Sequence, residues 1–366
     1  MEDRKIRVAI THGDTNGIGY ELIFKTFSEP EMLELCTPII YGSPKIAAYH
    51  RKALNIPANF SIITTADEAC DGRVNMLTTF DEEIKVDLGM PTPESGNAAM
   101  IALDRAMTDF RSGLFDAIVT IPVDKNSVKG YNGQVGFIEK SLGEGQQSMT
   151  ILLNESLRVG LVTDNLPIKD VVQAITTETI KEKATILFNS IKRDFSISNP
   201  RVAILALNPD GKESGKEEQN IIKPAIDELL ESGVNVFGPY QADEIFGNGS
   251  YDAFDGVLAM YHDQGAAPFN AITSADGVKY SAGLPIVLAA PYHGPAFDMA
   301  GKCEADETSF RHAIYTVVDV FRNRQNYDEP LADPLRKLYH ERRDDSEKVR
   351  FSIQRKHENS IQERQE

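Results

Sequence analysis

The sequence has few cysteines, a deficit of basic residues and no long apolar segment. Its 366 residues include three cysteines, Cys36, Cys70 and Cys303, and none of them belongs to a CxxC pair. Isolated cysteines provide neither a disulfide framework nor a zinc knuckle, and they are typical of a reducing compartment. The chain has 38 Lys and Arg against 55 Asp and Glu, a formal net charge of −17. This balance argues against binding to nucleic acid or to an anionic membrane, since either needs a basic face.

No segment is apolar over the length that a bilayer requires, and the first residues do not form a signal peptide. Residues 1–5 are mostly charged, and the apolar run that follows them is short. We therefore expect a cytoplasmic protein whose partner is a small molecule rather than nucleic acid or a membrane.

Short β-branched runs alternate with helical periodicity along most of the chain. We predict strands in residues 6–10, 38–41, 117–121, 149–153, 158–163, 202–207 and 256–260. We predict helices in residues 19–27, 96–110, 168–195 with a break near 176–177, 221–232 and 307–324. Apolar strands that alternate with amphipathic helices are typical of a mostly parallel sheet covered on both faces, so the fold class is α/β. The chain is longer than the length beyond which a single hydrophobic core usually stops growing. We therefore expect two lobes.

The apolar run 257–260 leads through Tyr261 to His262 and Asp263, with Gly265 shortly after. A strand that delivers a histidine and a carboxylate into a glycine turn is how a parallel-sheet enzyme presents metal ligands or acid–base groups. The alternative is an ordinary hydrogen-bonded histidine at the end of a strand.

A second glycine turn, residues 13–21, follows the first predicted strand and opens a helix. It reads Gly-Asp-Thr-Asn-Gly-Ile-Gly-Tyr-Glu. The glycines permit a tight turn, and free amides at the start of the helix could face an anion. The turn is not a Rossmann fingerprint, because Leu22 stands where the third glycine of GxGxxG would be. A turn with a purely structural role is the alternative.

With three further strings, these motifs resemble the 4-hydroxythreonine-4-phosphate dehydrogenase (PdxA) family of vitamin B6 biosynthesis. The further strings are Leu-Asn-Pro at 207–209, Gly-Pro-Tyr-Gln-Ala-Asp at 238–243 and Ala-Gly-Leu-Pro at 282–285. The resemblance covers residues 5–325. It implies two α/β lobes with a cleft between them, as in isocitrate and isopropylmalate dehydrogenases. The implied lobes are residues 1–126 with 275–325, and residues 127–274, followed by a charged tail or helix over 326–366.

The resemblance also implies an NAD-dependent homodimer whose active sites, at the subunit interface, hold a divalent ion with three ligands. Asn165 and Asp210 occupy two positions at which the family has histidine, whereas His262 matches the third. An amide and a carboxylate in place of two imidazoles shift the preference from zinc toward Mg²⁺ or Mn²⁺ and lower the affinity. Asp263 and Lys125 match further family positions and are the catalytic candidates. Asp263 would orient a metal ligand, and Lys125 would neutralise a substrate anion.

The positions that contact substrate in the family are changed more extensively. Gln134 and Val135 replace a histidine and a threonine, Asn270 replaces a lysine, Lys279 an asparagine and Leu288 an arginine. A phosphate needs charge-assisted donors. Leu288 cannot supply them, whereas Lys279 restores one positive charge.

The family's nucleotide site corresponds to the first glycine turn and to a later segment that begins His-Gly. The residues predicted to bind the cofactor are Gly13, Asp14, Asn16, Gly17, His293 and Asp298. A packing role is the alternative for His293, because a histidine in a glycine turn can simply satisfy backbone groups.

Three functions are compatible with these motifs. The first is an NAD-dependent dehydrogenase that oxidises 4-phosphohydroxy-L-threonine or a related 3-hydroxy acid, which then loses carbon dioxide. The second is a catalytically impaired paralogue that keeps the fold and a nucleotide site, since losing several transition-state groups is costly. The third is a dehydrogenase for a substrate without a phosphate.

Overall fold

The computed structural model describes residues 4–80, 84–124, 131, 133–143, 145, 147–210 and 215–333. Lys125, one of the two catalytic candidates, lies outside these residues. Backbone contacts divide the chain into two units, Met1–Tyr327 and Asp328–Glu366. All strands of the described residues belong to the first unit.

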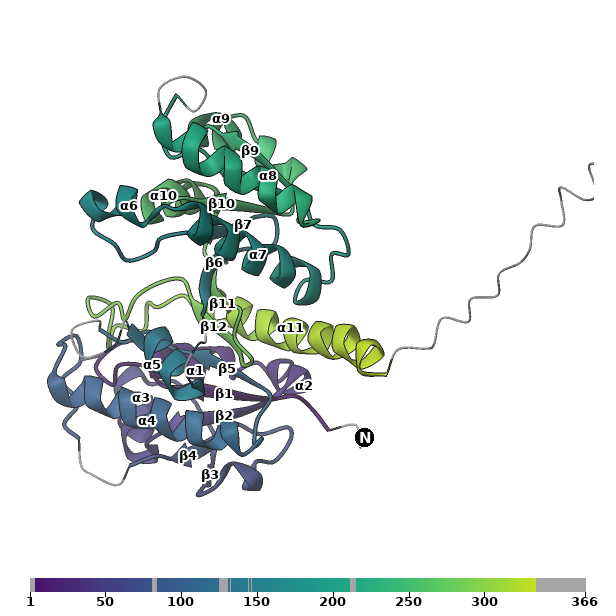
Figure 1. Cartoon of the computed structure of the whole chain (residues 1–366). Coiled ribbons are helices and arrows are strands. Elements are labelled where there is room, and N and C mark those ends of the chain that lie inside the picture. Colours follow the sequence, from purple (N-terminus) through teal and green to yellow (C-terminus); the bar gives the residue numbers. More distant parts are fainter. Residues whose placement is uncertain are drawn as a thin grey trace, which may run out of the picture. The chain divides into compact units, whose positions relative to one another are not determined.

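The described residues contain one mixed sheet of twelve strands in the order β3-β4-β2-β1-β5-β12-β11-β6-β7-β10-β8-β9 (Figure 1). The strands are β1 (Arg7–Thr11), β2 (Thr37–Gly42), β3 (Ser61–Ile63), β4 (Asn75–Thr78), β5 (Ala117–Thr120), β6 (Met149–Leu153), β7 (Arg158–Leu161), β8 (Val202–Leu205), β9 (Val236–Tyr240), β10 (Gly256–Ala259), β11 (Val278–Ala282) and β12 (Val287–Pro291). Neighbours are parallel except where β11 pairs with β12 and β6, and where β6 pairs with β7. The predicted α/β class is confirmed, with an antiparallel segment inside a largely parallel sheet.

The helices follow the predicted alternation. They are α1 (Gly19–Thr26), α2 (Met32–Leu35), α3 (Pro44–Leu54), α4 (Pro93–Arg111), α5 (Gly133–Leu142), α6 (Ile168–Ala174), α7 (Thr177–Arg193), α8 (Lys223–Glu231), α9 (Ala242–Gly247), α10 (His262–Ile272) and α11 (Thr308–Ala332). The predicted break between α6 and α7 is confirmed. Thr176 causes it, because its hydroxyl accepts a hydrogen bond from the backbone N–H of Thr179 and so caps α7. Within the described ranges, every helix is too short or too polar to cross a membrane.

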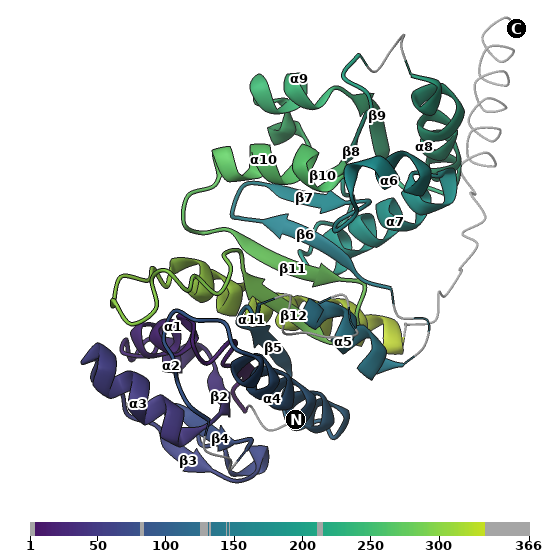
Figure 2. The same ribbon diagram turned by 90° about the vertical axis from the view of Figure 1, so that its left-hand side faces the viewer.

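Helices cover the sheet along most of its width. Helix α4 packs on β1 and β2, α8 packs on β9, and α7 and α10 pack on the strands around β7 and β10 (Figure 2). Val8, Ala9 and Ile10 on β1 are fully buried, as expected for a strand covered on both faces.

The segment after β10 differs from the sequence prediction. His262 and Asp263 begin helix α10, and Gly265 lies inside that helix rather than in a turn. A Cβ atom on Gly265 would come within 2.8 Å of side-chain carbons of Val159 and Leu161. The glycine therefore serves the close packing of α10 on β7, which overrides its low helix propensity.

Candidate active site

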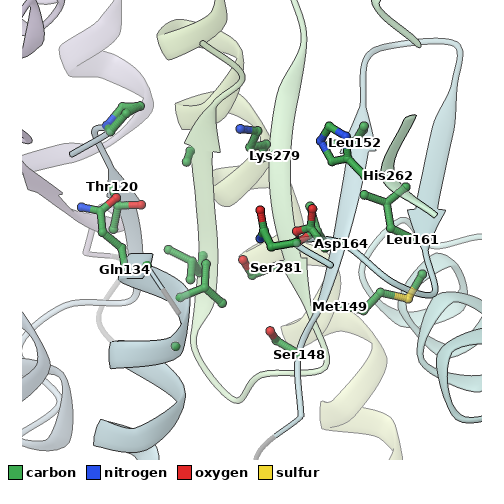
Figure 3. Close-up of a pocket in the computed structure, with 18 of the residues that line it drawn as sticks. Thr120, Gln134, Ser148, Met149, Leu152, Leu161, Asp164, His262, Lys279 and Ser281 are labelled. Carbon is green, nitrogen blue, oxygen red and sulfur yellow. The ribbon is translucent and has the colours of Figure 1, made fainter. Parts of the chain in front are cut away.

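A cavity of about 700 Å³ lies over the antiparallel segment of the sheet (Figure 3). Its floor consists of two rows of side chains that cross β12, β11 and β6. One row is Ala290, Lys279 and Leu152, and the next is Leu288, Ser281 and Thr150. Because residues directly opposite each other in antiparallel strands point to the same face, each row presents its side chains together.

The predicted substrate-binding residues are distributed unevenly over this cavity. Lys279 and Leu288 belong to its floor, and Gln134 and Val135 line it from α5. The Gln134 side chain is anchored, because its Nε2 donates a hydrogen bond of 3.2 Å to a backbone carbonyl at the end of β5. Asn270 is exposed on α10 and is not among the lining residues.

The predicted metal ligands do not all reach the cavity. His262 and Asn165 line it, whereas Asp210 is exposed and does not. The Nδ1 atom of His262 lies 2.9 Å from a carboxylate oxygen of Asp263. No three His, Cys, Asp or Glu residues of the described chain lie close enough together to hold an ion. The described part of one chain therefore does not bring three such ligands together, and no catalytic step is assigned to a metal.

The segments that lead to Asn165 and to His262 are tied to each other at the carboxyl ends of β7 and β10. The backbone N–H and the hydroxyl of Thr163 both donate to the carbonyl of Met260, at 3.2 and 2.8 Å. Gln264 accepts a hydrogen bond from the N–H of Met260 and donates to the carbonyl of Ala206. These bonds link the ends of β7, β10 and β8, where ligands of α/β sheets commonly bind.

The turn of residues 13–17 is fully buried. Gly13 has a φ of +73°, and a Cβ atom there would lie 2.6 Å from a side-chain carbon of β5's neighbour Ile121, so only glycine fits. The N–H of Asn16 donates to a carboxylate oxygen of Asp14, and the N–H of Gly17 donates to the Asp14 carbonyl. These amides have protein partners in this conformation, and cofactor binding by the four predicted residues of the turn stays a prediction.

His293 lines the cavity and has a ring nitrogen without a partner. Its Nδ1 lies 2.8 Å from the carbonyl of Gly294 and therefore carries the proton that it donates. The Nε2 atom is buried and has no hydrogen-bond partner among the described residues. Burial lowers the pKa of His293, and the nearby charge of Lys279 lowers it further. A bound group with an N–H or O–H would satisfy Nε2, and a role of His293 in nucleotide binding stays a prediction. Asp298 is exposed outside the cavity.

Four charged residues that line the cavity were not among the sequence candidates, namely Asp124, Glu139, Asp164 and Lys183. The hydroxyl of Thr150 donates a hydrogen bond of 3.0 Å to Asp164, and Thr150 lies opposite Ser281 in the floor. Lys183 reaches the cavity from α7, and its ammonium donates to the carbonyl of Ser148 at 2.8 Å. A signal for Asp164 was present, because it directly precedes Asn165 at the end of a predicted strand.

Two solved structures that share the fold of this chain are dehydrogenases. A 4-hydroxythreonine-4-phosphate dehydrogenase from Burkholderia phymatum matches with a TM-score of 0.72 and 27% identity, over 87% of this chain and 99% of the other. The corresponding enzyme from Klebsiella pneumoniae matches with a TM-score of 0.75 and 25% identity, over 88% and 99% of the two chains.

The family model "Pyridoxal phosphate biosynthetic protein PdxA" matches residues 34–317. A 4-hydroxythreonine-4-phosphate dehydrogenase of Bacteroides thetaiotaomicron is 52% identical over 96% of this chain and 98% of its own length. An Oceanobacillus iheyensis protein with the provisional name D-threonate 4-phosphate dehydrogenase is 32% identical over 87% and 98%. The chain belongs to the PdxA family, which confirms the resemblance seen in its motifs.

Proposed function

We propose that the protein is an NAD-dependent dehydrogenase that oxidises 4-phosphohydroxy-L-threonine in pyridoxal phosphate biosynthesis. The observation that carries this proposal is the 52% identity to a 4-hydroxythreonine-4-phosphate dehydrogenase over nearly the whole of both chains. The main alternative, an impaired paralogue, is less well supported, because two thirds or more of the chain also align with several further proteins of that name.

In this reaction, the carbon that carries the substrate hydroxyl transfers a hydride to NAD⁺, and the hydroxyl loses its proton. The resulting ketone lies next to a carbon bearing the carboxylate, which can leave as carbon dioxide. NAD⁺ supplies the oxidising power when bound, and His293 would accept a hydrogen bond from it at the buried Nε2. Lys279 would hold a substrate anion above the sheet, and its apolar neighbours in the floor, Ala290 and Leu152, would help to exclude water from the reacting carbon.

The first prediction is that the purified protein forms NADH from NAD⁺ and 4-phosphohydroxy-L-threonine. We expect a rate within about tenfold of that of the Bacteroides thetaiotaomicron relative, because the two chains are 52% identical over nearly their whole lengths. Absorbance of NADH is the measurement, with the relative as the positive control and with Mn²⁺, Zn²⁺ or a chelator added in separate reactions. A rate at background in all of these would contradict the proposal and favour the impaired paralogue.

A substrate without a phosphate is a second candidate, and Leu288 is the observation that favours it. This apolar side chain belongs to the cavity floor at the position predicted to hold a cation. The same assay with 4-hydroxy-L-threonine tests this candidate. A higher kcat/KM for the unphosphorylated compound would establish it, whereas a lower one would eliminate it.

We also propose that the protein is a homodimer. The supporting observation is a group of exposed apolar side chains on and just before α6, directly after the cavity residue Asn165. Leu166, Ile168 and Val172 are 45%, 69% and 51% exposed. Exposed apolar groups of this kind mark interaction surfaces, and a second copy of the chain is the partner that family membership suggests.

The second prediction is that Ile168→Asp weakens the dimer at least tenfold, because it places a charge in an apolar contact. Sedimentation or light scattering over a range of protein concentrations measures the dissociation constant. Ile62→Asp is the matched control, since Ile62 is 63% exposed on β3. Equal effects of the two substitutions, or a monomeric wild-type protein, would rule out this surface.

A further inference from the structure

The Asp164 carboxylate is held in the cavity by a neighbour in the floor. Thr150 donates from its hydroxyl to Oδ2 of Asp164 at 3.0 Å, and Thr150 stands in the same row as Ser281 and Leu288. The preceding residue, Thr163, is fixed by its two hydrogen bonds to the carbonyl of Met260, directly after β10. One carboxylate therefore has a defined position above the floor and remains in contact with the space that a ligand would fill (Figure 3).

Lys279 presents the opposite charge near the same place. Its ammonium lies 5.2 Å from the centre of the Tyr292 ring. Burial raises the pKa of the Tyr292 hydroxyl, a side-chain contact with Asn270 lowers it, and the charge of Asp164 raises it. Lys279 also stands in the floor row next to that of Thr150, the residue that holds Asp164, and both Lys279 and Asp164 line the cavity, which therefore offers an anionic acceptor and a cationic donor to one ligand.

We propose that Asp164 binds the ammonium group of an α-amino acid substrate while Lys279 binds its carboxylate, which makes Asp164 a specificity-determining residue. This inference rests on the proposed function. The names of two relatives give two different substrates, and these differ in the group on the carbon next to the carboxylate. 4-Hydroxythreonine 4-phosphate carries an ammonium group on the carbon next to its carboxylate, whereas threonate 4-phosphate carries a hydroxyl there. Only the ammonium forms a charge-assisted bond with an ionised carboxylate.

The third prediction concerns Asp164→Asn, which keeps the size of the side chain and an oxygen that Thr150 can still contact. We expect kcat/KM for 4-phosphohydroxy-L-threonine to fall about 10- to 100-fold, mainly through KM, because a charged hydrogen bond is lost. We expect kcat/KM for D-threonate 4-phosphate to change less than about threefold, since its hydroxyl can bond to an amide. The measured quantity is the ratio of the two values.

Two further variants serve as comparisons. Thr150→Val removes the hydroxyl that orients Asp164 but keeps the charge, so we expect a smaller loss with the same substrate preference. Asp252→Asn removes one charge from an exposed residue outside the cavity and should leave the ratio unchanged.

The outcomes separate this inference from the proposed function. If Asp164→Asn lowers kcat/KM equally for both substrates, or lowers it for neither, the proposed role of Asp164 is overturned even if the enzyme is active. If the wild-type protein oxidises neither compound, the proposed function fails, and calorimetry without NAD⁺ then compares the affinities of the two compounds directly. Weaker binding of the amino acid alone by Asp164→Asn would support the inference, and unchanged binding would reject it.

Discussion

Replacing Arg324 with methionine is expected to lower the free energy of unfolding by about 3 to 5 kcal/mol, because it breaks a buried ion pair. The Nε atom of Arg324 lies 2.7 Å from a carboxylate oxygen of Asp194, and these side chains are 7% and 2% exposed. Methionine fills much of the same volume but leaves a carboxylate buried without its cation. Denaturant-induced unfolding of the wild-type and variant proteins measures the difference.

The expected loss is large because Arg324 connects three parts of the fold. Its guanidinium also donates to the hydroxyl of Tyr280 at 2.9 Å and to the carbonyl of Leu284 at 3.0 Å. The Tyr280 hydroxyl in turn donates to Asp194 at 2.6 Å. Helix α11, the end of α7 and strand β11 are therefore joined through one network. The neighbours of Tyr280 on β11, residues 279 and 281, belong to the cavity floor, so the substitution should also raise KM.

A substitution on the same helix provides the control. Arg311 forms ion pairs with Glu29 and Glu307, whose side chains are 51% and 25% exposed, so Arg311→Met should cost about 1 kcal/mol or less. Combining Arg324→Met with Asp194→Leu should recover part of the stability, because no buried charge then remains unpaired. Similar losses in the two single variants would show that the buried pair is not the cause.

The alternation of strands and helices could be predicted because it follows from local patterns. The break between α6 and α7 is an example, since threonine is a residue type that favours the N-cap position, and Thr176 caps α7 in the structure. Helix α10 could not be predicted in the same way. Gly265 and Pro268 disfavour a helix locally, and the need for close packing of Gly265 on β7 is visible only in the tertiary structure.

The cavity was only partly predictable from the sequence for a related reason. The family resemblance pointed to Lys279 and Leu288 one by one, but their places in adjacent rows depend on how β11 pairs with β12. Strand register is set by tertiary pairing and by the connecting turn. Asp164 was missed because its importance depends on its contact with Thr150, a residue 14 positions away on another strand.

A pair of buried histidines lies beneath the turn of residues 13–17. His12 and His50 are 0% and 1% exposed, and the ring of Tyr20 lies between them, with centroids 5.4 and 5.0 Å away. The Nε2 of His50 donates to the carbonyl of Thr15 at 2.8 Å. Burial lowers the pKa of each histidine to about 4. Both are therefore neutral in the folded protein at neutral pH.

We expect the free energy of unfolding to decrease steeply as the pH falls from 6.5 to about 4. The unfolded chain binds a proton at each histidine near pH 6.5, whereas the folded chain resists protonation until about pH 4. Stability from the neutral imidazoles is therefore complete above the unfolded pKa and is lost as the pH approaches the folded pKa. The difference between the unfolded and folded pKa of each histidine corresponds to about 3 kcal/mol in the free energy of unfolding.

The variant His50→Gln isolates one half of this effect. Glutamine can still donate to the Thr15 carbonyl but does not titrate, so the variant should be less stable than the wild type near neutral pH because of lost packing. That deficit should shrink by about 2 kcal/mol between about pH 7 and about pH 5, because the wild type alone loses the stabilisation of a neutral His50. Denaturant-induced unfolding at the two pH values measures both deficits. A deficit that stays constant would mean that His50 is protonated equally in the folded and unfolded chains, and it would remove His50 as a cause of acid instability beneath the turn that is predicted to face the cofactor.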